Sequence, residues 1–173
     1  MLKDLSEYNI KFEGLKQGIH FYEFTVDNEF FAGFDCFEFD KSAINVELEF
    51  KKQSTMLVLT FIFTGTISVP CDRCLDEVDV DVEGEEKLIV KFGNEDYDQS
   101  DEILILPIHE YELNVAEYIY EFINVNLPQK RVHFEGLCNQ KVIDELEKIE
   151  QKTEIVNDPR WSGLKDINLN KNK

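Results

Sequence analysis

The feature that most constrains the fold is a period-two alternation of apolar and polar residues in the middle of the chain. It runs through residues 43–51 and returns in residues 78–83, where valines alternate with acids. Successive side chains of a strand point to opposite faces, so this alternation predicts strands with one buried and one wet face, as in an antiparallel sheet. In the first of these segments the apolar positions are Ile44, Val46, Leu48 and Phe50.

Further strand signals surround these two segments. Residues 17–26 alternate and are rich in aromatic side chains, and residues 55–64 are apolar on both faces, as in a central strand. We expect Gly65 to break or bulge that strand before it continues to Val69, and Gly84 to bend the next one. Residues 86–92 and 103–108 are also predicted to be extended, with Pro107 at a strand end or edge.

Helical signals follow the strands. A stripe of apolar residues from 115 to 126 ends before Pro128, with Asn114 as the expected N-cap. A second helix is predicted at 139–151 and a short third one from Asp158 to Ile167. Strands followed by helices predict an α+β fold, mainly an antiparallel β-sheet with the C-terminal helices packed on it. Whether the sheet closes into a barrel stays open. We expect a single domain over residues 1–168 and a flexible polar tail at 169–173.

The net charge of −18 is concentrated in one part of the chain. Residues 72–121 carry a net −14, whereas residues 129–173 carry a net +1. This excess of acids opposes bulk binding of nucleic acid, which needs Lys and Arg to replace phosphate counterions. One interpretation is a well-solvated surface; the sharper one is an acidic face that binds a basic protein.

We expect a cytoplasmic protein without a membrane segment. The longest apolar run, residues 56–63, is far shorter than the roughly 20 residues that a spanning helix needs. The N-terminus has no apolar signal segment. The four cysteines are therefore expected to be reduced, so they do not predict a disulfide framework.

A short knuckle, Cys71-Asp72-Arg73-Cys74, lies between two strand-like segments. Two thiols at this spacing can bind zinc, but a structural zinc site normally has four ligands. His133 and Cys138, spaced H-x4-C, are the candidates for the remaining two positions, with His109 and Cys36 as less favoured ones. The alternative is a reduced knuckle shaped by local hydrogen bonds. A thioredoxin-like redox pair is disfavoured because no βαβ unit surrounds the knuckle.

Basic and aromatic residues near the knuckle and in the C-terminal part are candidates for contact with a partner or with RNA. Each has an ordinary alternative: a local ion pair for Arg73, a solvated loop for the others, and packing of the last helix for the tryptophan. No nucleotide-binding loop, zinc-protease motif or nucleophile signature is present, so an enzyme is not predicted. The candidate contact residues are Arg73, Lys130, Arg131, Arg160 and Trp161.

Two short motifs, together with their order and spacing, resemble those of one known family. They are Cys71-x-Arg73-Cys74-Leu75 and Asp158-Pro159-Arg160-Trp161-x-x-Leu164. Over the region from about Val69 to Leu164, the chain resembles the YceD-like family of large-subunit ribosomal RNA accumulation proteins. Many relatives carry a second Cys-x-x-Cys in the C-terminal part. Here only His133 and Cys138 stand in that area, which leaves His133 as a substitute ligand.

The resemblance implies a role in the accumulation of large-subunit ribosomal RNA and no known enzymatic activity. In some relatives the gene lies beside that of a small basic large-subunit ribosomal protein. We therefore expect a non-enzymatic factor whose acidic face binds a basic ribosomal protein or assembly factor. One alternative is a protein that binds ribosomal RNA directly through the basic C-terminal patch. Another is a small zinc-stabilised interaction module unrelated to ribosomes. The sequence leaves the oligomeric state open.

Overall fold

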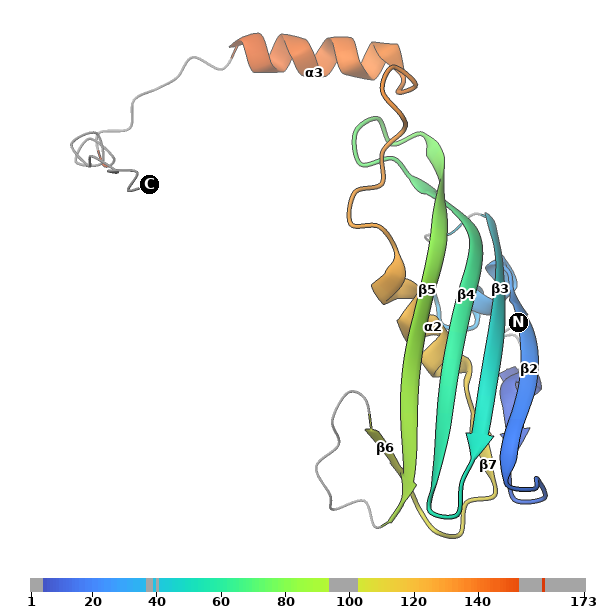
Figure 1. The fold of residues 1–173 in the computed structure, drawn as a ribbon. Coiled ribbons are helices and arrows are strands. Elements are labelled where there is room, and N and C mark those ends of the chain that lie inside the picture. The colour runs from blue at the N-terminus through green and yellow to red at the C-terminus, as the bar shows by residue number, and fades with distance from the viewer. Residues whose placement is uncertain (1–4, 37–38, 40, 94–102, 153–159, 161–173) are drawn as a thin grey trace, which may run out of the picture.

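The computed structural model describes residues 5–36, 39, 41–93, 103–152 and 160. Strands dominate the first two thirds of the chain, and the two longer helices follow (Figure 1). The elements are η1 (Leu5–Tyr8), β1 (Asn9–Lys11), β2 (Gly18–Val26), α1 (Asn28–Ala32), β3 (Lys41–Lys52), β4 (Met56–Pro70), β5 (Glu77–Phe92), β6 (Ile103–Leu106), β7 (Glu112–Asn114), α2 (Ala116–Asn126) and α3 (Gln140–Lys152).

The main sheet has the strand order β2-β3-β4-β5-β6. Its first four strands pair antiparallel, and the short β6 lies parallel to β5 at the edge. β1 and β7 form a separate antiparallel pair. The predicted α+β fold with a mainly antiparallel sheet is confirmed, and within the described residues the sheet stays open, with β2 and β6 as its edges. Pro107 ends β6 at this edge, as its missing N–H group predicts.

The two strand glycines do not interrupt their strands, so the predicted break or bulge at Gly65 is wrong. The register of β3 and β4 runs through Gly65 without an extra residue. A side chain at Gly65 would clash with the carbonyl oxygen of Ala43 on β3. At Gly84 it would clash with the side-chain amide of Asn126 on α2. Both glycines allow a close approach of another part of the chain rather than a break in pairing.

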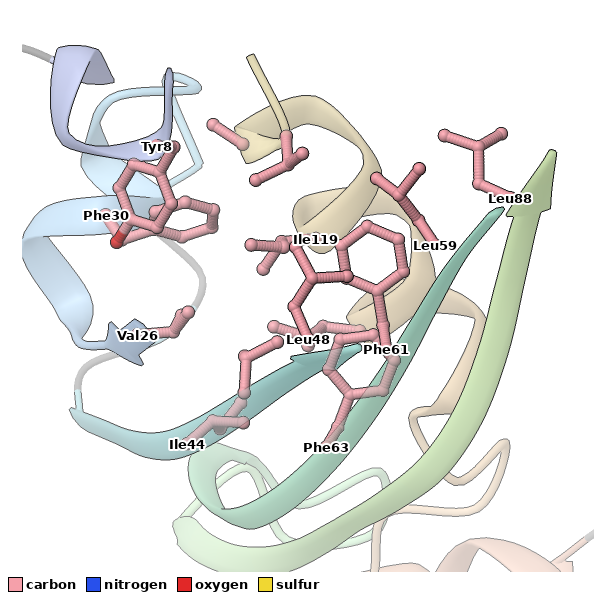
Figure 2. Packing of buried hydrophobic residues seen from close by; sticks show 14 of the residues in the cluster. Tyr8, Val26, Phe30, Ile44, Leu48, Leu59, Phe61, Phe63, Leu88 and Ile119 are labelled. Carbon is pink, nitrogen blue, oxygen red and sulfur yellow. The ribbon is translucent and has the colours of Figure 1, made fainter. Parts of the chain in front are cut away.

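The inner face of the sheet carries the hydrophobic core. Leu48, Phe61 and Ile119 are fully buried where α2 crosses the inner face (Figure 2). The ring of Phe61 on β4 meets the ring of Phe122 on α2 edge to face, with centroids 5.4 Å apart. Tyr8 and Phe30 extend the core beyond β2, with their ring centroids 5.0 Å apart. The helix therefore covers one face of the sheet only.

The two longer helices have different surroundings. The N-cap of α2 is Val115, one residue later than predicted, although Asn114 still accepts the Ala116 N–H through Oδ1 at 2.9 Å. α2 packs on the sheet, whereas α3 lies beyond its end (Figure 1). Leu146 and Ile149 on α3 are 41% and 61% exposed, so most of this helix lies outside the core. The helix predicted at residues 158–167 and the tail at 169–173 lie outside the described residues, apart from Arg160.

Candidate metal centre and acidic face

Two loops meet at the end of the sheet where β4 and β5 join. The first is the knuckle between these strands, and the second connects α2 to α3. They bring Cys71, Cys74, His133 and Cys138 together, with all four ligand atoms within 4.8 Å of one another. The three cysteines are buried, and the hydrophobic start of α3 packs against them through Val142 and Ile143. The four residues expected as ligands are thus gathered into one cluster that could hold a metal ion.

The spacing of the ligand atoms fits a tetrahedral zinc ion. The Sγ atoms of Cys71 and Cys138 are 4.0 Å apart, and Nδ1 of His133 lies 3.5 Å from Sγ of Cys74 and 3.9 Å from Sγ of Cys138. With Zn–S bonds of about 2.3 Å and a Zn–N bond of about 2.0 Å, tetrahedral geometry requires S–S separations of roughly 3.8 Å and S–N separations of roughly 3.5 Å. These three distances are within a few tenths of an ångström of the required values, and all four ligand atoms lie within 4.8 Å of one another.

Hydrogen bonds outside the cluster hold the ligands in place. Nε2 of His133 lies 3.0 Å from the carbonyl oxygen of Glu77, which can only accept, so Nε2 carries the proton. Nδ1 then presents its lone pair to the sulfur atoms, as metal-binding histidines require. The backbone N–H of Arg73 donates to Sγ of Cys71 at 3.4 Å, as donors around a thiolate do.

The knuckle and the second loop are also joined by backbone and side-chain bonds. The Asp72 N–H donates to the Arg131 carbonyl, and the Arg131 N–H donates to Oδ2 of Asp72, both at 2.7 Å. Asn139 donates to Oδ2 of Asp76 at 3.1 Å. Within the knuckle, the Leu75 N–H closes the turn on the Cys71 carbonyl at 2.9 Å, and Leu75 adopts a φ of 63°. These contacts keep the four ligands together across 67 residues of sequence.

The groups of the cluster differ in how readily they lose their protons. Burial raises the pKa of the Cys71 thiol, but N–H groups of Cys74, Arg73 and His133 outweigh it and lower that pKa to about 6. Burial raises the pKa of Cys138, and the neighbouring sulfurs of Cys71 and Cys74 raise it further. The bond to Cys71 raises the pKa of His133. One thiolate thus forms readily, whereas three together need a divalent cation to offset their repulsion.

The outer face of the main sheet is uncovered and strongly acidic. We call it the acidic face, and it includes an unbroken alternation of exposed acids along β5 from Glu77 to Glu85. Glu47 on β3 is paired in register with Glu23 on β2 and with Ile62 on β4, which in turn pairs with Glu85. Like charges placed directly opposite each other destabilise a sheet, so this arrangement has a cost that the fold alone does not require. The acids of this face are Glu23, Glu47, Glu49, Glu77, Asp79, Asp81, Glu83 and Glu85.

Large apolar side chains are interspersed among these acids. Phe21 is 75% exposed on β2, and Ile19 and Ile62 are 50% and 41% exposed on the same face. Phe21 is paired in register with Glu49, and Ile62 with Glu47. An exposed apolar patch surrounded by charged residues is typical of an interaction surface. The sequence pattern placed Ile19 and Phe21 on the same side of their strand, but it did not indicate that this side is exposed to solvent.

The residues predicted to contact a partner or RNA lie at different places. Arg73 is exposed in the knuckle, Lys130 is exposed and Arg131 half-buried in the loop before α3, and Arg160 is exposed. Trp161 lies outside the described residues. The clamp between Asp72 and Arg131 was not predicted from the sequence, where its signal is an acid directly beside a candidate metal ligand. The exposure of Phe134, next to His133, was not predicted either.

Among the described residues, no helix has the length and apolar character needed to cross a membrane.

Comparison with known proteins gives one match. No curated protein and no solved structure matches the chain. A family model described as "Large ribosomal RNA subunit accumulation protein YceD" matches residues 59–168, which include the knuckle, β5, α2, α3 and all four clustered ligands. The chain therefore belongs to the YceD family of large ribosomal RNA subunit accumulation proteins.

Proposed function

We propose that this protein is a non-enzymatic, cytoplasmic factor that promotes accumulation of large-subunit ribosomal RNA by binding a basic ribosomal or assembly protein on its acidic face. The observation that carries the proposal is the uncovered outer face of the sheet, which carries eight acids together with the exposed side chains of Phe21 and Ile62. Ribosomal proteins are basic because they bind RNA, so such a face matches them in charge. The family's name supplies the link to ribosomal RNA.

Charge and hydrophobic contact have separate parts in this proposal. The acids would speed the encounter with a basic partner and select against acidic ones. The aromatic and aliphatic side chains of Phe21, Ile19 and Ile62 would supply the desolvated contacts that set affinity. Phosphate groups would be repelled from the same face, which supports a protein rather than RNA as its occupant.

The Cys/His cluster is proposed to hold a structural zinc ion through Cys71, Cys74, His133 and Cys138. All four tetrahedral positions are then taken by protein, as in structural sites, whereas catalytic zinc keeps a position open for water or substrate. The ion would fasten the loop after α2 and the start of α3 to the end of the sheet. This role supports an interaction protein rather than an enzyme.

The acidic face is tested in cells by neutralising four acids of β5 at once, in D79N/D81N/E83Q/E85Q. We expect the ratio of large-subunit to small-subunit ribosomal RNA to fall to the level of cells that lack the gene. The reason is that the partner loses most of its electrostatic attraction to the sheet. Quantification of the two mature RNAs in a gene-replacement strain measures this ratio.

The control changes the same charge on another exposed element. D144N/E145Q/E147Q/E150Q neutralises four acids on α3, outside the acidic face, and should keep the wild-type ratio. Immunoblotting confirms that both variants accumulate to the same level. Equal ratios for the β5 and α3 variants would show that the acidic face has no part in the function.

A further inference from the structure

The end of the molecule that holds the Cys/His cluster differs in surface chemistry from the rest of the described chain. We call residues 71–76 and 129–139 the knuckle tip. Three large apolar side chains are exposed on it, and each is the direct sequence neighbour of a proposed zinc ligand. Leu75 follows Cys74, Phe134 follows His133, and Leu137 precedes Cys138; they are 79%, 87% and 67% exposed. Phe134 is the most exposed of the large apolar side chains among the described residues.

The acids around the knuckle are engaged within the protein. Asp72 accepts the backbone N–H of Arg131, and Asp76 accepts the amide of Asn139. At the start of β5, Glu77 pairs with Lys41 at 2.8 Å. Glu135 is the one acid in the second loop of the tip. These hydrogen bonds fix the positions of the two aspartates but do not remove their charge, so the tip is formally neutral, with three acids and three cations.

The cations of the knuckle tip are not paired in this way. Among the residues that the structure describes, the side chains of Arg73, Lys130 and Arg131 form no ion pair or hydrogen bond. The local pair with an acid that is the ordinary expectation for Arg73 is not formed. Three available cations thus lie on the same two clamped loops as an exposed aromatic ring. Surfaces that bind single-stranded nucleic acid use these two kinds of group, because cations contact phosphates and aromatic rings stack on unpaired bases.

We propose that the knuckle tip binds single-stranded RNA, with Phe134 stacking on a base and Arg73, Lys130 and Arg131 contacting phosphates. This inference rests on the proposed role in ribosomal RNA accumulation and adds a direct RNA contact to it. The clamped loops fix the site before RNA arrives, so little ordering is needed on binding. Duplex RNA hides its bases from an aromatic ring, and its dense phosphates would meet the neighbouring acidic face. The tip is therefore selective for unpaired segments.

The test uses the full-length, zinc-loaded protein and a fluorescein-labelled single-stranded RNA of about 12 nucleotides, within the range of sites on such surfaces. Fluorescence anisotropy at several salt concentrations gives the affinity and its salt slope. Because the variant loses the stacked base, Phe134→Ala is expected to weaken binding about tenfold. Its salt slope should not change, because no phosphate contact is lost. Since Phe134 is 87% exposed, the substitution does not disturb the core.

Two further variants separate stacking from charge. R73Q/K130Q/R131Q should reduce the salt slope by about 2, since each phosphate contact on a single strand contributes about 0.7. Phe21→Ala removes an aromatic ring of similar exposure from the acidic face and should bind RNA as the wild type does. A duplex of the same length should bind more weakly than the single strand.

Absence of RNA binding at low salt, or equal affinity of the Phe134→Ala and Phe21→Ala variants, would overturn the inference. Loss of a bound protein, but not of RNA, on Phe134→Ala would show that the tip is a protein-docking surface instead. Neither result affects the acidic face, which the β5 variant tests independently. Failure of that variant to change ribosomal RNA, with RNA binding at the tip intact, would remove the proposed function of the face alone.

Discussion

Replacing Cys74 by serine is expected to reduce bound zinc from one ion per chain to almost none. The hydroxyl of serine is a poor zinc ligand, and the three remaining ligands leave one coordination position open to water. Cys74 is 3% exposed, and Nδ1 of His133 lies 3.5 Å from its sulfur. The substitution therefore removes a ligand atom from the buried centre of the cluster. Because metal binding contributes directly to folding, the two loops should separate when the ion is lost.

Elemental analysis of reduced protein measures the zinc, and hydrogen exchange locates the structural consequence. Amides of residues 130–143 should lose protection, whereas those of β3 and β4 should keep it, since their core contains none of the ligands. Cys36→Ser provides a matched control, because Cys36 is half-buried and is not among the clustered ligands. It should retain one zinc per chain.

Two results would contradict the zinc proposal. One is wild-type protein, kept reduced and never exposed to chelator, that contains far less than one zinc per chain. The other is Cys74→Ser protein that retains as much zinc as Cys36→Ser protein does. Either result would favour the alternative of a reduced knuckle held by hydrogen bonds alone.

Phe61→Ala is expected to lower the free energy of unfolding by about 3–5 kcal/mol. The side chain is fully buried on β4, and its ring meets Phe122 of α2 with centroids 5.4 Å apart. Truncation would leave a cavity between the sheet and the helix that covers it. Such a loss is a large part of the 5–15 kcal/mol that typically stabilises a domain. Denaturant unfolding at a fixed excess of zinc measures the change without a contribution from altered metal binding.

Phe21→Ala makes the same substitution on the opposite face of the same sheet. Because Phe21 is 75% exposed, its removal should change the free energy of unfolding by no more than about 0.5 kcal/mol. A similar loss of stability in both variants would contradict the assignment of one covered and one open face. The comparison therefore also tests whether the acidic face is uncovered in solution.

The strands could be predicted from the sequence because their faces have different surroundings. Alternation at residues 43–51 reflects the buried inner face and the wet outer face of β3. The glycines could not be interpreted in the same way. Gly84 is needed where Asn126 of α2 comes close, and no local pattern reveals a contact between residues so far apart in the chain. The prediction of a break at Gly65 was wrong for the same reason, because the residue that comes close to Gly65 is Ala43 on another strand.

The candidate metal centre was predictable in composition but not in structure. Few cysteines and histidines are available, so Cys71 and Cys74 favoured His133 and Cys138 as partners over His109 and Cys36. What the sequence did not reveal is the clamp that joins the loops, in which Asp72 exchanges two bonds with Arg131. Nor did it reveal the exposure of Phe134, because a lone phenylalanine is more often part of a core.

Capture of the tagged full-length protein from a low-salt lysate, with and without nuclease, tests most directly whether the acidic face binds a basic partner. We expect a basic large-subunit ribosomal or assembly protein to stay bound after nuclease treatment. It should be released as salt rises, because charges are screened over about 8–10 Å at moderate ionic strength. It should also be missing from the D79N/D81N/E83Q/E85Q capture. A capture that contains only ribosomal RNA and disappears with nuclease, or a partner held equally well by that variant, would contradict the proposal.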